Sequence, residues 1–174
     1  GKHFLLKLTT AASVFTNDIN SSEVEATDKG VIKLIDAFNV NTSTQFHYAV
    51  DGSFGYTGNN FGIGAAYKRI SPDYKSMGVY FVTNDVEQYT LIPSVNLWKR
   101  KIRLGGSVGF EHDNLAANRS FQTERVIGSA NVSINPSPVF FITGNYYNYS
   151  IGQIQGIKQL NDTIRLAQVN RGIT

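Results

Sequence analysis

The chain has 174 residues, no cysteine, 12% aromatic residues and 17% charged residues, a charged fraction below the roughly 25% of an ordinary soluble domain. The lack of cysteine excludes a disulfide scaffold and a cysteine-based zinc site. No run of about 18 apolar residues predicts a membrane-spanning helix. The net charge of +3 is modest and spread out, so the composition does not favour a nucleic-acid partner.

Alternation of side chains predicts a long strand over residues 44–56. Even positions such as Phe46 and Phe54 are aromatic or aliphatic, whereas odd positions such as His47 and Asp51 are polar or small. The thirteen alternating residues exceed the roughly 5–6 of a mean strand and reach the roughly 9–11 that a transmembrane strand needs. A strand over residues 3–15 is predicted to precede it.

Three hairpins are predicted along the rest of this pattern. The first turns at Thr57-Gly58-Asn59-Asn60, where Gly and Asn favour a positive φ. The second turns at Trp98 to Lys101 and the third at Asn135-Pro136-Ser137-Pro138. The predicted strands of these hairpins are 44–56 with 61–68, 89–97 with 102–111, and 125–134 with 139–149, and a weaker strand lies within 163–174.

Longer polar connections separate the hairpins. They cover residues 16–43, 70–86, 112–122 and 150–162, and Val31 to Phe38 within the first has the spacing of a short amphipathic helix. Short turns at one end and long loops at the other are typical of an outer-membrane barrel. The sequence therefore predicts an all-β fold, an antiparallel transmembrane β-barrel of about seven to eight strands, with residues 1–174 as a single barrel segment.

The two faces of these strands differ in a way that favours lipid over water. The apolar faces of the core segments carry no charged residue, while the opposite faces carry Gly, Ser and Asn with isolated charges. We expect a lumen to receive His47, Asp51, Lys68, Arg103, Glu111 and Arg125. We expect aromatic girdles at the membrane interfaces to include Phe54, Tyr56, Phe61, Trp98, Phe140 and Tyr147.

The stretch from Asn41 to Tyr149 resembles the barrel region of large outer-membrane β-barrel proteins of Bacteroidota-type bacteria. The motifs that carry the resemblance are Asn41-Thr42-Ser43-Thr44, the run from Gly62 to Tyr74, Asn84-Asp85-Val86-Glu87 and Asn135-Pro136-Ser137. The resemblance implies the bacterial outer membrane as location and one arc of a larger barrel as architecture. It implies no reaction.

The predicted function is that of a pore, a scaffold or a subunit of an outer-membrane transport or assembly machinery. The expected partners are outer-membrane lipid, lipopolysaccharide and other outer-membrane or periplasmic proteins, with no nucleic acid and no cofactor. No catalytic, cofactor-binding or metal-binding residue is assigned. The turn from Trp98 to Lys101 fits either an interfacial lipid anchor or a solvated hairpin turn.

Two alternatives remain open from the residues alone. One is a membrane hydrolase at the barrel rim that uses His112 with Asp113 or Glu111 for proton transfer, although no G-x-S-x-G motif supplies a nucleophile. The other is a soluble ligand-binding β-barrel, because alternation by itself does not state which medium the apolar face meets.

Overall fold

The computed structural model describes residues 3–22, 40–76, 78, 83–137, 139–155 and 167–174. Every regular element in this part of the chain is a β-strand. The helix predicted between Val31 and Phe38 lies outside the described residues. The strands are β1 (His3–Thr16), β2 (Thr44–Thr57), β3 (Phe61–Ile70), β4 (Val86–Leu97), β5 (Ile102–Asp113), β6 (Phe121–Ser137), β7 (Phe140–Gln155) and β8 (Ala167–Ile173).

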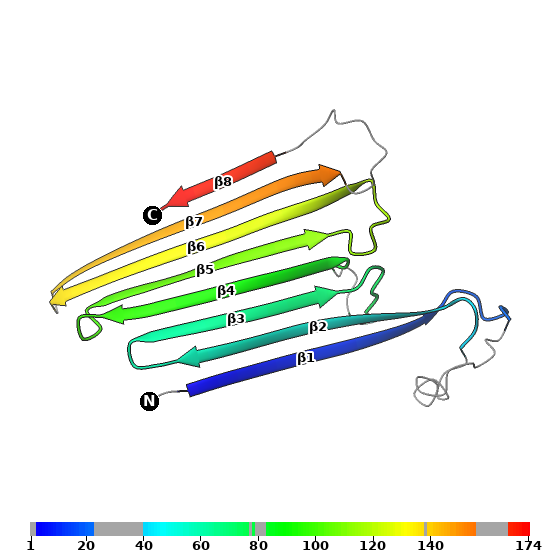
Figure 1. Ribbon diagram of the computed structural model, residues 1–174, viewed down its shortest axis with the longest axis horizontal. Helices are drawn as coiled ribbons and strands as arrows, with labels where there is room; N and C mark the ends of the chain where they lie inside the picture. Colours follow the sequence, from blue (N-terminus) through cyan, green and yellow to red (C-terminus); the bar gives the residue numbers. More distant parts are fainter. Residues whose placement is uncertain (1–2, 23–39, 77, 79–82, 138, 156–166) are drawn as a thin grey trace.

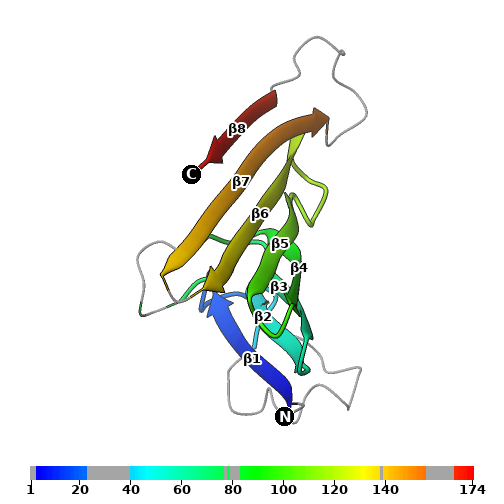
Figure 2. The ribbon, with the colours of Figure 1, turned by 90° about the vertical axis from the view of Figure 1, so that its left-hand side faces the viewer.

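The strands form one antiparallel meander in which each strand pairs with its neighbours in the chain, in the order β1 to β8 (Figure 1). The short turns β2–β3, β4–β5 and β6–β7 lie at one end of the sheet, and the longer connections lie at the other. The sheet is bowed but not closed, since no pairing between β1 and β8 is found among the described residues (Figure 2). The all-β antiparallel fold is confirmed, and the open sheet is consistent with one arc of a barrel.

The strands are longer than the sequence pattern predicted at the end that carries the long connections. The strand predicted over residues 139–149 extends to Gln155, and its partner begins at Phe121 rather than at residue 125. The alternation weakens in these extensions, where polar side chains occupy both faces, so hydrophobic periodicity does not reveal them. Backbone pairing nevertheless continues there, and the register runs without interruption from Phe121↔Gln155 to Ile134↔Ile142.

Two turn predictions are wrong in detail. Asn135, Pro136 and Ser137 belong to β6, where the register shifts in a bulge between Ile134 and Ser137, so the third turn is shorter than expected. In the first turn no residue has a positive φ, and Gly58 N donates to Phe61 O at 2.7 Å to close it. The second turn instead carries the left-handed residues.

Trp98, Lys99 and Arg100 have φ values of 49°, 55° and 69°. The left-handed region costs a residue with a Cβ about 1–2 kcal/mol, so this hairpin holds three unfavourable conformations in succession. Lys101 N donates to Trp98 O at 3.0 Å and closes the turn. The sequence carries no Gly or Asn at these positions to indicate such a turn.

The three short turns are staggered along the strand direction. In the register, Leu97 at the end of β4 lies three residues beyond Ser94, which pairs with Gly62 near the β2–β3 turn. Ser137 at the end of β6 lies three residues beyond Ile134, which pairs with Ile102 at the β4–β5 turn. Each turn therefore protrudes about 10 Å further than the preceding one over two strand spacings of roughly 4.8 Å each. A line through the turn ends is inclined by about 45° to the strands.

The sheet buries little apolar surface. Among the described residues only two hydrophobic side chains, Ile70 and Val86, are buried. Both belong to the end with the long connections, where the chain returns from β3 to β4. Most of the large exposed hydrophobic side chains of the strands share one face, although Leu5, Ile92 and Phe141 lie on the other. The described sheet is a single layer whose apolar surface is uncovered.

Candidate functional site

The strand register sorts the side chains into two faces of opposite character. On one face the register aligns Phe54 of β2 and its alternate neighbours with residues that are mostly apolar from β1 to β6. We call this face the apolar face. The polar face carries Asp51 and its paired residues. Large exposed side chains of the apolar face include Leu6, Leu8, Phe46, Phe54, Phe61, Ile63, Tyr89, Leu91, Leu97, Leu104, Phe110, Ile142 and Val169. Exposed apolar side chains follow one another across this face from strand to strand. An ordinary soluble monomer instead carries separate apolar patches of a few hundred Å².

The apolar face has a charge-free band between the short turns and a border of polar side chains. On β4 the band runs from Tyr89 to Leu97, which is about 27 Å along an extended strand. Within this band on β3 to β6 the apolar face carries no Asp, Glu, Lys, Arg or His. The band is therefore uniformly uncharged on these four strands.

One row of paired residues forms the border of this band towards the long connections. Its members, in strand order from β3 to β6, are Arg69, Glu87, His112 and Glu124. They alternate between a cationic or titratable basic side chain and a carboxylate. The neighbouring row inside the band is aromatic, with the Tyr67 and Tyr89 rings 5.1 Å apart and Phe110 beside Tyr89 in the register.

Glu87 is the centre of this charged row. Its side chain is 11% exposed, and its Oε1 accepts hydrogen bonds from Tyr67 Oη at 2.6 Å and Arg69 Nη1 at 3.1 Å. His112 Nε2 lies 3.3 Å from Glu87 Oε2. The Arg69 guanidinium also lies 6.0 Å from the centroid of the Tyr48 ring. These contacts bind β3, β4 and β5 together where the apolar band ends.

A shallow groove lies in the middle of the apolar band. Small residues such as Gly52 and Ala65 form its floor between larger side chains of the flanking strands. The groove measures about 600 Å³, and its walls include Leu6, Leu8, Phe54, Leu91, Val108 and Phe110. Its open, apolar shape suits a flexible hydrocarbon chain more than a polar ligand.

The structure brings the six predicted lumen residues onto one face. His47, Asp51, Lys68, Arg103, Glu111 and Arg125 all occupy the polar face in the register. Arg125 Nη1 forms an ion pair with Glu111 Oε1, and Lys68 is paired in the register with Asp51. Lys68, Gln88, Glu111 and Arg125 line a polar cavity of about 390 Å³ with Tyr149. His47 and Arg103 lie away from this cavity, nearer the two ends of the sheet.

The predicted interface aromatics divide between the faces. Phe54, Tyr56 and Phe61 occupy the apolar face near the β2–β3 turn, where the Tyr56 and Phe61 rings are 5.3 Å apart. Phe140 opens β7 on the same face, and Trp98 lies in the β4–β5 turn. Tyr147 differs from the expectation: it pairs with Ser129 on the polar face, and its ring covers Gly172 of β8. The sequence alternation of β7 is ambiguous because Tyr146 and Tyr147 are adjacent, and only the pairing assigns them to faces.

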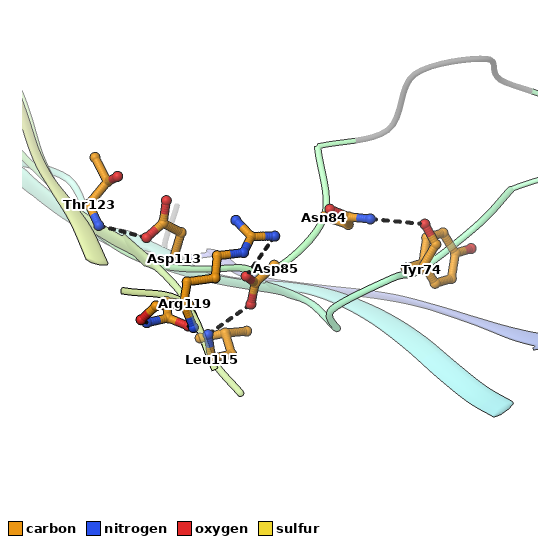
Figure 3. A network of polar contacts seen from close by, with 8 residues as sticks. Tyr74, Asn84, Asp85, Asp113, Leu115, Arg119 and Thr123 are labelled. Carbon is orange, nitrogen blue, oxygen red and sulfur yellow. Dashed lines mark hydrogen bonds and ion pairs between the residues drawn. The ribbon is translucent and has the colours of Figure 1, made fainter. Parts of the chain in front are cut away.

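A polar clamp joins two of the long connections (Figure 3). Asp85, 1% exposed, accepts a hydrogen bond from Leu115 N at 2.8 Å and contacts Arg119 Nη2 at 3.2 Å. Asn114 Oδ1 accepts from Arg119 N, and Asp113 Oδ1 accepts from Thr123 N at 2.6 Å. The connection that ends at Asp85 is therefore fastened to the β5–β6 connection through one buried carboxylate.

The geometry does not bring together the proton-transfer pair that the hydrolase alternative placed at His112. Glu111 and Asp113 are its chain neighbours on β5, so their side chains point to the polar face while His112 points to the apolar face. Glu111 instead pairs with Arg125, and Asp113 is bound to the Thr123 backbone. The carboxylate that His112 contacts is Glu87, which is 25 residues earlier in the chain and is brought opposite by the register.

No cluster of three metal-ligating side chains occurs within the residues that the structure describes. In the same part of the chain no helix has the length and apolarity needed to cross a membrane. Comparisons with protein-family models, curated proteins and solved structures find no match to this chain. The site must therefore be interpreted from its own geometry.

Sequence reasoning missed the charged row and the clamp. The row was detectable in principle, because Arg69, Glu87 and His112 continue the alternation of the apolar positions by one further step. Their pairing across strands required the register, since they are separated by 18 and 25 residues. Asp85 had a weaker signal: it stands in the Asn84-Asp85-Val86-Glu87 motif, but nothing in the sequence names Leu115 and Arg119 as its partners.

Proposed function

We propose that these residues form an arc of a transmembrane β-barrel in the bacterial outer membrane, with the apolar face against lipid and the polar face towards a lumen. The observation that carries the proposal is the charge-free band that the apolar face forms on β3 to β6, bounded on one side by the short turns and on the other by the charged row of Arg69, Glu87, His112 and Glu124. An Arg or Lys at the bilayer midplane on a lipid-facing strand position costs about 2–4 kcal/mol, so such a band must exclude charge.

The stagger of the turns supports the same proposal independently. If the three turn ends lie in one plane parallel to the membrane, the strands tilt by about 45°, which is the tilt of transmembrane strands. At that tilt the band from Tyr89 to Leu97 rises about 20 Å, close to the roughly 25 Å of an outer-membrane barrel. A flat sheet in water would require neither this strand tilt nor this height of the apolar band.

The polar face supports a role as a wall of a pore or of a scaffold for transport or assembly. Asp51, Lys68, Glu111 and Arg125 place both signs of charge at one level of the sheet. Side chains of a lumen tune what passes through it. Among the described residues no strand pairs with the outer edge of β1 or of β8. In lipid these edges require further strands, because open backbone groups there have no water to bind. A larger barrel supplies those strands.

Single-cysteine scanning tests the proposal directly, since the segment has no native cysteine. In native membranes, the intact chain with a cysteine at Leu104, Val108 or Phe110 should resist a membrane-impermeant maleimide and accept a lipid-soluble one. Cysteine at the intervening positions Gly105, Ser107 or Gly109 should react with the impermeant reagent. Equal labelling of the two sets by the impermeant reagent would remove the membrane proposal and favour the soluble barrel.

A further inference from the structure

The β4–β5 turn concentrates positive charge beside an exposed tryptophan. Trp98 follows Leu97, the last apolar-face residue of β4, and Lys99, Arg100 and Lys101 follow Trp98 directly. The Trp98 side chain is 77% exposed. The three successive left-handed residues from Trp98 to Arg100 hold this turn in a conformation that residues with a Cβ disfavour. Strained backbone conformations of this kind are frequent at binding sites, where the free energy of binding offsets the strain.

Charge is segregated along the strands of the described sheet. The dividing line is the row that contains Asp51, Lys68 and Glu111. Between this row and the short turns, the described residues include no Asp or Glu. The cations in that region are Lys7, Lys99, Arg100, Lys101, Arg103 and Arg171. All described carboxylate side chains lie on that row or beyond it towards the long connections: Asp18, Asp51, Asp73, Asp85, Glu87, Glu111, Asp113 and Glu124.

The position of the β4–β5 turn relative to the apolar band determines which part of the membrane it contacts. Leu97 and Ile102 form the last paired positions of β4 and β5 and belong to the apolar face. Trp98 stands at the next position, where an amphipathic ring is best placed between hydrocarbon and water. Lys99 to Lys101 lie one step further, at the depth of lipid headgroups, where cations are attracted to anionic lipid.

We propose that the turn from Trp98 to Lys101 binds the headgroups of anionic phospholipids. The inference rests on the proposed membrane position and adds a lipid class to it. Phosphate groups are the complementary ligand, because Lys99, Arg100 and Lys101 are exposed and have no ion pair with any described residue. No described carboxylate side chain lies at this end of the sheet to compete with the lipid phosphates for these cations.

Trp98 makes the proposal measurable, because it is the single tryptophan of the segment. We would reconstitute the intact chain, with Trp98 as its sole tryptophan, into phosphatidylcholine vesicles containing 20% phosphatidylglycerol. Bromine would be placed on the acyl chains of one lipid or the other at an equal mole fraction. We expect brominated phosphatidylglycerol to quench Trp98 fluorescence about twofold more than brominated phosphatidylcholine, since anionic lipid gathers around the turn.

The variant Lys99→Gln/Arg100→Gln/Lys101→Gln should make the two brominated lipids quench equally. The control Lys68→Gln/Lys75→Gln removes two positive charges on the dividing row or beyond it towards the long connections, and it should keep the difference. Equal quenching of the unmodified chain by both lipids would overturn the lipid selectivity while leaving the membrane position intact. Absence of quenching by either lipid would overturn the membrane position of the turn, and with it both proposals.

Discussion

His112 and Glu87 lie opposite each other in the β4–β5 register, with His112 Nε2 3.3 Å from Glu87 Oε2. The contact joins two strands at the line where apolar side chains give way to charged ones. Tyr67 and Arg69 reach the same carboxylate from β3. Glu87 thereby connects three strands through side chains, in addition to the backbone ladder, on the face that is otherwise mostly apolar.

Removal of the Glu87 carboxylate should destabilise the sheet. Glu87→Ala leaves Arg69 and the Tyr67 hydroxyl without their acceptor in a largely buried place, and we expect a loss of about 2 kcal/mol in the free energy of unfolding. Urea unfolding of the reconstituted chain measures it. Glu124→Ala is the control, because Glu124 belongs to the same row but is exposed, and its removal should change stability by less than about 0.5 kcal/mol. Equal effects of the two variants would contradict the central role of Glu87.

Loss of the Asp85 carboxylate should release the connections at the other end of the sheet. Asp85→Asn keeps a side chain that tolerates the φ of 57° but weakens the buried contacts to Leu115 N and Arg119. Hydrogen exchange of the Leu115 amide should then be at least tenfold faster, which corresponds to a free energy of local opening lower by about 1.4 kcal/mol or more. Asp73→Asn is the matched control, since Asp73 has a φ of 56° but is exposed. Unchanged exchange at Leu115 in the Asp85 variant would show that the clamp does not hold the loop.

A charge in the middle of the apolar band should be far more costly than the same charge one residue away. Leu91→Arg places a guanidinium on the apolar face and should lower the stability of the membrane-folded state by about 2–4 kcal/mol. Thr90→Arg projects to the polar face opposite Gly109, where the missing side chain leaves room, and should cost less than about 1 kcal/mol. Folding yield into vesicles, followed by heat-modifiable gel mobility, compares the two. A larger loss for Thr90→Arg would mean that the faces have been assigned to the wrong media.

Relief of a left-handed residue should stabilise the β5–β6 connection. Ala117 has a φ of 51°, so Ala117→Gly should raise the free energy of unfolding by up to about 1 kcal/mol. Ala116 is its neighbour in the same exposed turn and does not have a positive φ, so Ala116→Gly should have no effect or lower stability slightly. Denaturant midpoints of the two variants provide the comparison. Stabilisation by Ala116→Gly alone would contradict the assigned backbone conformation.

The alternation of the sequence by itself determined the fold class, the strand positions and the membership of the polar face. Side chains of a strand point to opposite faces with a period of two, so Asp51 and Lys68 could be placed on one face before any pairing was known. The pattern also predicted which connections are short and which are long, but not their bounds, because β6 and β7 extend into stretches predicted as connections. This was possible because apolar side chains recur at every second position within a strand, as from Phe46 to Phe54, and the recurrence stops where the strand ends.

Tertiary structure alone decided which residues meet across strands. Register joined Glu87 to His112, placed Tyr147 on the polar face, and moved Asn135 to Ser137 from a turn into a bulged strand. The packing of two connections joined Asp85 to Leu115. Register also set the stagger of the turns, from which the strand tilt follows. A strand's own sequence fixes only the direction of each side chain, whereas the neighbour it contacts depends on how far one strand has slid along the next.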